Sequence, residues 1–82
     1  MDDLQLLPLP KLSEQLGRGR SSIYTDIKAG LLTRPIEVGP NSNRWPAGEV
    51  RQVIQARIAG KNPGEIRALV QRLHEARKAV PA

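Results

Sequence analysis

The sequence predicts a small, mainly α-helical domain that includes a β-hairpin, and three observations predict it. Apolar residues recur at helical spacing in several separate segments. A glycine-containing turn separates the first two of these segments, and a stretch of alternating apolar and polar residues lies between the second and the third. With 82 residues, of which 39% are hydrophobic, the chain can form one compact domain but is too short to enclose a catalytic pocket.

The first helix is expected over residues 11–16, because leucines at i, i+3 and i+7 form one buried edge: Leu9, Leu12 and Leu16. The segment that follows places Gly17 and Gly19 on either side of Arg18. Glycine adopts left-handed backbone conformations without a steric penalty, so the chain can change direction sharply here. The first helix is therefore predicted to be short and to end at this turn.

A second helix is expected over residues 20–29, with Gly30 as a left-handed C-terminal cap. At about 100° per residue, Ile23 and Ile27 share one face. The opposite face and its flank contain cations and short hydrogen-bonding side chains, while the one acid, Asp26, lies to the side; the polar set is Arg20, Ser21, Tyr24, Thr25 and Lys28.

The hairpin follows. Ile36 and Val38 alternate with Glu37, and residues 39–43 form a dense turn of Gly, Pro, Asn and Ser. We expect two strands with a polar tip. An isolated hairpin is only marginally stable in water, so it should lean on the helices, with Trp45 as a core anchor rather than a DNA-intercalating wedge.

Two further helices complete the expected fold. The third begins at Pro46, ends at Gly60 and packs by Val50, Val53, Ile54 and Ile58. The fourth begins with Asn62 as N-cap and Glu65 three residues later, and presents an apolar stripe of Ile66, Leu69, Val70 and Leu73. The expected division is a domain over residues 6–60 and a C-terminal amphipathic helix over residues 62–80.

Composition limits the partners. Thirteen Lys and Arg against 8 Asp and Glu give a net charge of +5, which favours an acidic polymer or anionic surface. Because Met1–Pro10 contains two acids and no base, the positive charge belongs mainly to the middle of the chain. Tyr24 and Trp45 are the whole aromatic inventory. Single-strand and RNA binders stack bases on several aromatic rings, so duplex DNA is the expected partner.

Other functions are disfavoured. The chain has no cysteine and a single histidine, His74, which excludes disulfides and thiolate zinc sites; we expect no metal and no cofactor. No nucleophile, base and orienting group occur together, so we expect no enzyme. No stretch approaches the roughly 20 apolar residues of a membrane span, and the N-terminus lacks the basic start of a secretory signal. The predicted location is the cytoplasm.

The two short helices, their turn and the hairpin together match a winged helix-turn-helix with an extra C-terminal helix. The second helix would enter the major groove, where Arg and Lys reach guanine acceptors or phosphates. The hairpin tip would touch backbone or minor groove, flanked by Arg34 and Arg44. The predicted DNA contacts are Arg18, Arg20, Ser21, Ser22, Tyr24, Thr25, Lys28, Arg34, Asn41, Ser42, Asn43 and Arg44. The cations expected on solvated faces are Arg51, Arg57, Arg72, Arg77 and Lys78.

The sequence also resembles the AlpA family of phage regulatory proteins, within the MerR-like, excisionase-like winged helix-turn-helix group. The resemblance covers about residues 6–59 and rests on Leu-Gly-Arg-Gly-Arg-Ser-Ser-Ile-Tyr at 16–24, Gly-Leu-Leu at 30–32, Arg-Pro-Ile-Glu-Val-Gly at 34–39 and Arg44-Trp45. It implies that Arg20, Ser21, Ser22 and Tyr24 belong to the recognition helix, which favours a phosphate contact for the Tyr24 hydroxyl. It also implies that Arg44 and Trp45 end the wing. Two positions depart from the family pattern: Gly19 stands where a serine N-cap is usual, and Thr33 where a proline is common.

The resemblance implies action on prophages or integrative elements as a transcription regulator. The alternative is an excisionase, a recombination directionality factor that bends attachment-site DNA to direct an integrase. Either role gives an integrase or RNA polymerase as further partner. The apolar stripe of the fourth helix either folds back on the domain or meets another chain; we favour self-association into a homo-oligomer on DNA. A different class of function is a protein-interaction module, such as an antirepressor that docks by this helix.

Overall fold

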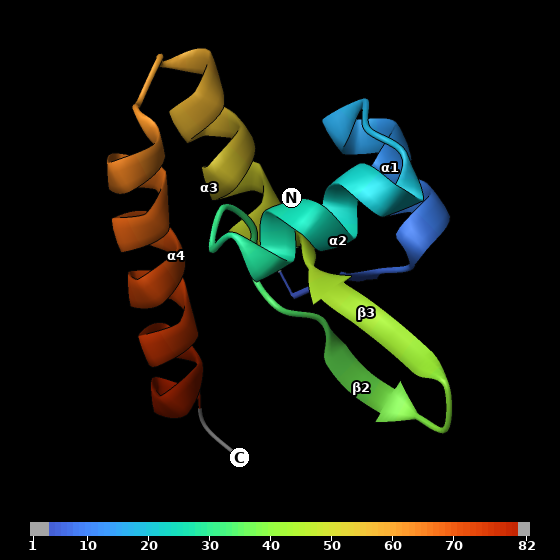
Figure 1. Cartoon of the computed structure of the whole chain (residues 1–82). Helices are drawn as coiled ribbons and strands as arrows, with labels where there is room; N and C mark the ends of the chain where they lie inside the picture. Colours follow the sequence, from blue (N-terminus) through green and yellow to red (C-terminus); the bar gives the residue numbers. More distant parts are fainter. Residues whose placement is uncertain (1–3, 81–82) are drawn as a thin grey trace.

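The computed structural model describes residues 4–80 and contains four α-helices and a small three-stranded antiparallel sheet. The expected mainly α-helical class is confirmed. Figure 1 shows α3 and α4 side by side at one end of the molecule and α1 at the other, with α2 between them and a hairpin of two strands, β2 and β3, projecting outward.

Helix α1 (Leu9–Leu16) and helix α2 (Arg20–Lys28) are joined by a tight turn. Gly17 has a φ of 66°, a left-handed backbone conformation that residues other than glycine rarely adopt. The Ser13 side chain accounts for part of the turn, because its hydroxyl donates to the carbonyl oxygen of Arg18. Each helix buries one fully inaccessible side chain, Leu12 and Ile23, against the common core. The short first helix and its end at the glycines are as predicted.

The sheet has one strand more than the sequence predicted. Strands β2 (Ile36–Gly39) and β3 (Ser42–Pro46) form the expected hairpin, with Asn41 in the left-handed region at its tip. A short strand, β1 (Leu6–Leu7), pairs with the other edge of β3, so that the order is β1-β3-β2. The prediction of a two-stranded ribbon is therefore wrong. A strand of two residues is too short to show the alternation by which strands are recognised in a sequence.

Trp45 holds the hairpin to the helices, as predicted. Its side chain is fully buried, and its indole Nε1 donates to the carbonyl oxygen of Thr33 at 3.1 Å. The ring also meets the ring of Tyr24 edge to face, with 6.3 Å between the centroids. The base of the hairpin is thereby fixed beside the middle of α2.

Helix α3 (Ala47–Ile58) closes the core by Val50 and Val53, both fully buried. Pro46 is the N-cap residue rather than the first residue of the helix. The expectation that Ile58 packs in the core is wrong, because its side chain is 81% exposed. Ile58 lies about 140° around the helix from Val53, at the last residue of α3, and is therefore turned away from the core.

Helix α4 (Pro63–Ala76) begins with the predicted capping box, in which Asn62 and Glu65 satisfy each other's backbone N–H groups, and it continues into a short 3₁₀ helix, η1 (Arg77–Ala79). Its apolar stripe packs against the same chain: Ile66, Val70 and Leu73 are buried in the core cluster, and Leu69 lies partly buried beside it. The preference for self-association through this stripe is therefore corrected, because these side chains are already covered by their own domain. One core cluster includes side chains from both predicted segments, residues 6–60 and 62–80.

Candidate nucleic-acid interface

The outward side of α2 carries five of the six predicted DNA contacts that lie in this helix. At about 100° per residue, its exposed side chains occupy a continuous arc of about 140°, while Ile23 and Asp26 point inward and are buried. The arc, here called the α2 face, consists of Arg20, Ser21, Tyr24, Thr25 and Lys28. The face therefore combines two cations with small polar side chains and contains no acid.

Ser22 lies off this face. It is half-buried and sits about 60° beyond Thr25, on the side of Asp26. The structure thus separates it from the other predicted contacts of α2. The helix begins after Gly19, which provides no side-chain cap, as expected from the missing hydroxyl at this position.

Three contacts order the α2 face. The Arg20 guanidinium lies over the ring of Tyr24, 5.9 Å from its centroid, and Tyr24 leans in turn on Trp45. Tyr24 as a residue is 37% exposed, so it both packs and remains accessible. The Thr25 hydroxyl donates to the carbonyl oxygen of Ser21 at 2.9 Å. Its proton is thereby engaged, and its methyl group and lone pairs are what it can offer to a ligand.

Asp26 is a buried acid between two arginines, a site that the sequence analysis missed. Its Oδ2 lies 3.0 Å from Nε of Arg18 and 3.5 Å from Nη2 of Arg57. Arg18, a predicted DNA contact, therefore also neutralises Asp26, although its side chain remains partly exposed. Arg57, predicted on a solvated face, is exposed and in addition links α3 to α2 through this ion pair. The pairing keeps the one acid of α2 away from the α2 face.

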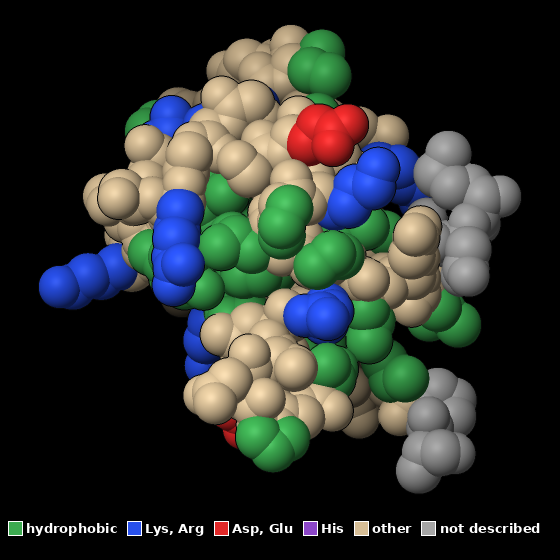
Figure 2. Space-filling model, turned by 90° about the vertical axis from the view of Figure 1, so that its right-hand side faces the viewer, with side chains coloured by type: hydrophobic (Ala, Val, Ile, Leu, Met, Phe, Trp, Pro, Cys, Tyr) green, Lys and Arg blue, Asp and Glu red, His purple; other side chains and the backbone are tan. Residues whose placement is uncertain are grey.

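The hairpin exposes its tip. Asn41 and Asn43 are exposed, and Ser42 is half-buried with its hydroxyl 3.5 Å from the carbonyl oxygen of Pro40. Arg44, half-buried on β3, donates to the carbonyl oxygen of Asn43 at 2.9 Å. Figure 2 shows the side of the molecule that includes α1 and the end of the hairpin, where Lys and Arg side chains border a central apolar area. The cations are thus distributed around this face rather than gathered in one patch.

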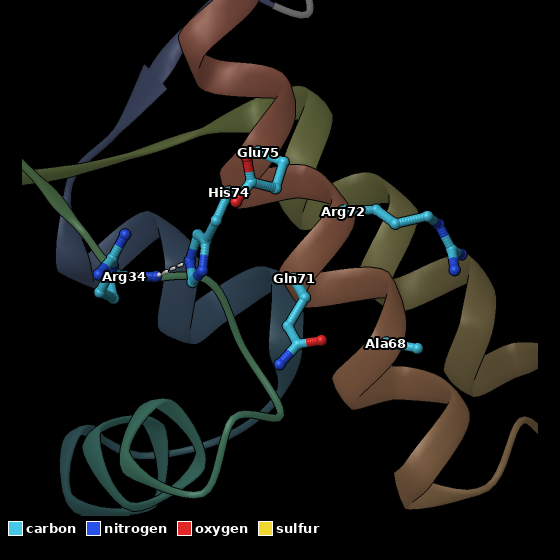
Figure 3. A pocket seen from close by; sticks show the side chains of 6 residues that line it. All are labelled: Arg34, Ala68, Gln71, Arg72, His74 and Glu75. Atoms are coloured by element: carbon cyan, nitrogen blue, oxygen red, sulfur yellow. Dashed lines mark hydrogen bonds between the residues drawn. The ribbon is translucent and has the colours of Figure 1, made fainter.

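Arg34 is at the base of the hairpin, in the segment that joins α2 to β2 (residues 29–35, here called the connector). An open hollow lies between Arg34 and the exposed side of α4, lined by Arg34, Ala68, Gln71, Arg72, His74 and Glu75. Figure 3 shows that the side chains of Arg72 and Gln71 point in different directions and that Arg72 is turned away from Arg34. The polar groups do not converge on one point, as they would in a small-molecule site.

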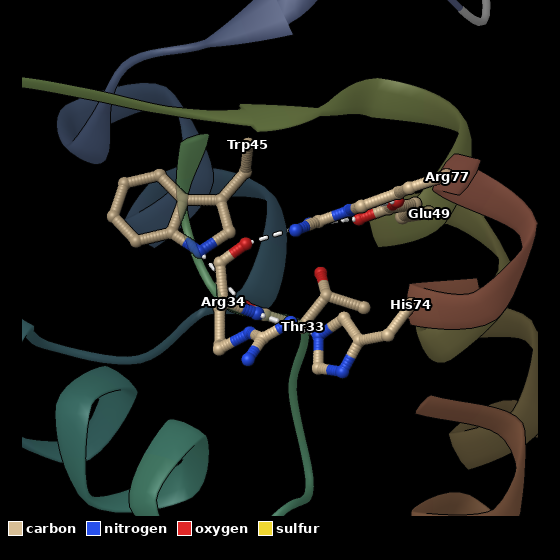
Figure 4. A network of polar contacts seen from close by, with 6 residues as sticks. All are labelled: Thr33, Arg34, Trp45, Glu49, His74 and Arg77. Carbon is tan, nitrogen blue, oxygen red and sulfur yellow. Dashed lines mark hydrogen bonds and ion pairs between the residues drawn. The ribbon is translucent and has the colours of Figure 1, made fainter. Parts of the chain in front are cut away.

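Residues 29–31 of the connector donate backbone hydrogen bonds back to α2, and side chains hold Thr33 and Arg34 farther along it (Figure 4). The carbonyl oxygen of Thr33 accepts from Trp45, the backbone N–H of Arg34 donates to Nε2 of His74 at 3.1 Å, and the carbonyl oxygen of Arg34 accepts from Nη2 of Arg77 at 2.6 Å. At the other end of the connector, Nε of Arg67 donates to the carbonyl oxygen of Ala29 at 2.9 Å. Helix α4 and η1 therefore contact both ends of the connector.

Arg77 is itself fixed. Its Nε and Nη2 donate to the two carboxylate oxygens of Glu49, in the first turn of α3, at 2.7 and 2.6 Å. The side chains are only 22% and 11% exposed, so the prediction that Arg77 lies on a solvated face is wrong. A bidentate pair of this kind fixes direction as well as distance.

His74 accepts a hydrogen bond in its neutral form. Burial lowers the pKa of His74 below its ordinary value of 6.5, and the charges of Arg34 and Arg77 lower it further, against an opposite effect of Glu49. As pH falls, His74 is therefore protonated in the unfolded chain before it is protonated in the folded protein. The contribution of His74 to stability is present above pH 6.5 and is lost as pH falls through the folded-state pKa.

Residues 4–80 contain no cluster of His, Cys, Asp and Glu that could hold a metal ion. Within the same part of the chain, no helix is long and apolar enough to cross a membrane. No family model, no curated protein and no solved structure matches the chain.

Proposed function

We propose that the protein binds double-stranded DNA through the α2 face, as a winged helix-turn-helix protein in which the hairpin is the wing. The observation that supports this most is the continuous exposed arc of α2, where two cations flank small polar groups and the one acid of the helix is turned inward. A helix with such a surface fits the major groove, because small side chains let its backbone approach and Arg or Lys reach base edges or phosphates.

The hairpin extends this surface. Its base adjoins α2 through Tyr24 and Trp45, and its exposed tip offers Asn41 and Asn43 to a phosphate or to the minor groove. The proposed base contacts come from Arg20, Ser21, Thr25 and Lys28. The proposed backbone contacts come from Arg18, Tyr24, Arg34, Asn41, Ser42, Asn43 and Arg44, and Ser22, which lies off the α2 face, is not among them.

The resemblance to AlpA-type phage regulators supports a role in transcription control of a prophage or integrative element in the cytoplasm. An excisionase would use the same surface but would bind several sites and bend the DNA. The antirepressor alternative depended on the apolar stripe of α4, which lies in the core of its own chain. Substituting Leu73 with aspartate would therefore damage the fold, so its effect does not distinguish this alternative from DNA binding.

The proposal is tested by selecting duplexes from a random pool with the wild-type protein and measuring its affinity for the enriched sequence. We expect one shared motif and a preference for the duplex over its separated strands. With five cations, Arg18, Arg20, Lys28, Arg34 and Arg44, at phosphates or base edges, log K should fall against log salt with a slope of about −4.5. Equal affinity for single and double strands, or no complex at low salt, would refute DNA binding by this surface.

The same complex distinguishes the two roles. Circular-permutation mobility of the bound fragment measures the bend, and titration measures the number of sites. A single straight complex over a promoter supports transcription control, while cooperative occupancy of several sites with a bend supports excision.

A further inference from the structure

We propose that α4 and η1 position the wing relative to the α2 face by hydrogen bonds to both ends of the connector, a set of contacts here called the grip. This inference rests on the proposed DNA-binding function. Three side chains make the grip: Arg67 at Ala29, and His74 and Arg77 at Arg34. They are positioning residues, because they act on the placement of the DNA-contacting residues and are not themselves among the contacts.

The geometry of α4 suits this role. Arg67, His74 and Arg77 recur after seven and three residues, so they lie along one flank of the helix beside its buried stripe. The stripe fixes α4 to the core, and the capping box fixes its first turn. Glu49 then fixes the Arg77 guanidinium from α3. The grip thus extends from a rigid base to both ends of the connector.

The grip determines the spacing between the α2 face and the hairpin. The connector leaves α2 just after Lys28 and enters the hairpin just after Arg34, both proposed DNA contacts. A backbone N–H or C=O group without a hydrogen-bond partner costs free energy. If the grip is lost, the connector can therefore shift to a conformation in which these groups find other partners. Contacts that must meet a groove and its flanking phosphates together lose affinity when they move by fractions of an ångström to an ångström. The grip therefore acts on DNA affinity without touching DNA.

The test compares Arg77→Met with Arg72→Met. Both remove one positive charge from the end of the chain that follows α3, so the long-range effect on DNA affinity is the same. Arg72 is exposed, and its side chain is turned away from Arg34. We expect Arg77→Met to weaken binding to the selected duplex by about fivefold to tenfold beyond Arg72→Met, with an equal salt slope for the two variants.

Stability is measured alongside. Circular dichroism gives the folded fraction, and titration against excess DNA gives the active fraction, so that affinity is assigned to folded protein only. A purely structural role for Arg77 would lower the active fraction and leave the affinity of the remainder at the level of Arg72→Met. That outcome, or equal affinity of the two variants, overturns the inference. Failure of the wild-type protein to bind any duplex would instead overturn the proposed function.

His74 offers a second readout that does not depend on Arg77→Met folding. His74→Gln retains an acceptor for the N–H of Arg34 but does not titrate, whereas His74→Leu has no acceptor. The charged groups that surround His74 are Arg34 of the connector, Arg77 of η1 and Glu49 of α3. We expect the Leu variant to bind severalfold more weakly than the Gln variant at pH 7.5. Equal affinities would contradict the grip.

The pH profile sharpens this readout. Protonation of His74 removes the nitrogen that accepts from the N–H of Arg34. Protonation also adds a positive charge, and that charge by itself would strengthen binding to DNA. We expect the opposite: as pH falls below 6.5 and through the lowered folded-state pKa of His74, the wild-type protein should lose affinity relative to His74→Gln. A wild-type profile that parallels the Gln variant, or that gains affinity over it, would overturn the inference.

Discussion

Replacing both Arg20 and Lys28 with glutamate is expected to abolish duplex binding at physiological salt while leaving the fold intact. Both side chains are exposed on the α2 face, so no core contact is lost. Loss of a cation that contacts a base or phosphate costs about 1 to 3 kcal/mol, and reversing its charge adds repulsion. For the pair, the affinity should therefore fall at least about 100-fold.

The matched control reverses two exposed cations elsewhere, Arg72 and Lys78, and changes the net charge equally. Fluorescence anisotropy with the selected duplex measures both variants at one salt concentration. Because long-range attraction depends on the overall charge, the control reports that effect alone. Should the two double variants bind within about threefold of each other, in the same salt, the α2 face would not be the contact surface.

Replacing Trp45 with alanine is expected to destabilise the protein by about 3 to 5 kcal/mol, a large share of the total stability of a small domain. The side chain is fully buried where β3, α2 and the connector meet. Its removal leaves a cavity and also deprives the buried carbonyl oxygen of Thr33 of its donor. Urea unfolding followed by circular dichroism measures the change.

Trp45→Phe separates the two effects. Phenylalanine retains an aromatic ring for the core but has no N–H, so the loss that remains comes from the unpaired Thr33 carbonyl and the smaller ring. We expect a destabilisation of about 1 to 3 kcal/mol, less than for alanine. A Trp45→Ala variant within about 1 kcal/mol of the wild-type protein would show that the ring does not anchor the hairpin.

Local patterns predicted the helices well. The bounds of α2 agree with the expected ones except for one residue at its end. They could be predicted because the isoleucine spacing and Gly30 define them. The capping box of α4 was predicted in full, because Asn62 and Glu65 lie close in the sequence. The amphipathic stripe of α4 was also recognised, but periodicity shows only that a face is apolar and does not identify what covers it. That limit is the reason why self-association was favoured over packing in the same chain.

The contacts that hold the candidate site together could not be predicted, because they join distant residues. Arg77 and Arg34 are 43 residues apart, and Arg77 belongs to a segment that looks like a solvated, basic helix end. Asp26 was recognised as lying beside the polar face, yet its partner on α3 follows no spacing rule. The face of α2, in contrast, follows from the helical repeat alone, which is why its exposed residues match the prediction except Ser22.

Lysine footprinting of the wild-type protein measures directly whether the α2 face lies against duplex DNA. Lys28 is on the α2 face, whereas Lys61 and Lys78 are exposed on other parts of the surface. Acetylation is measured residue by residue with and without the selected duplex. We expect strong protection of Lys28 and unchanged labelling of Lys61 and Lys78. Protection of Lys61 and Lys78 with Lys28 labelled at its free rate would contradict it.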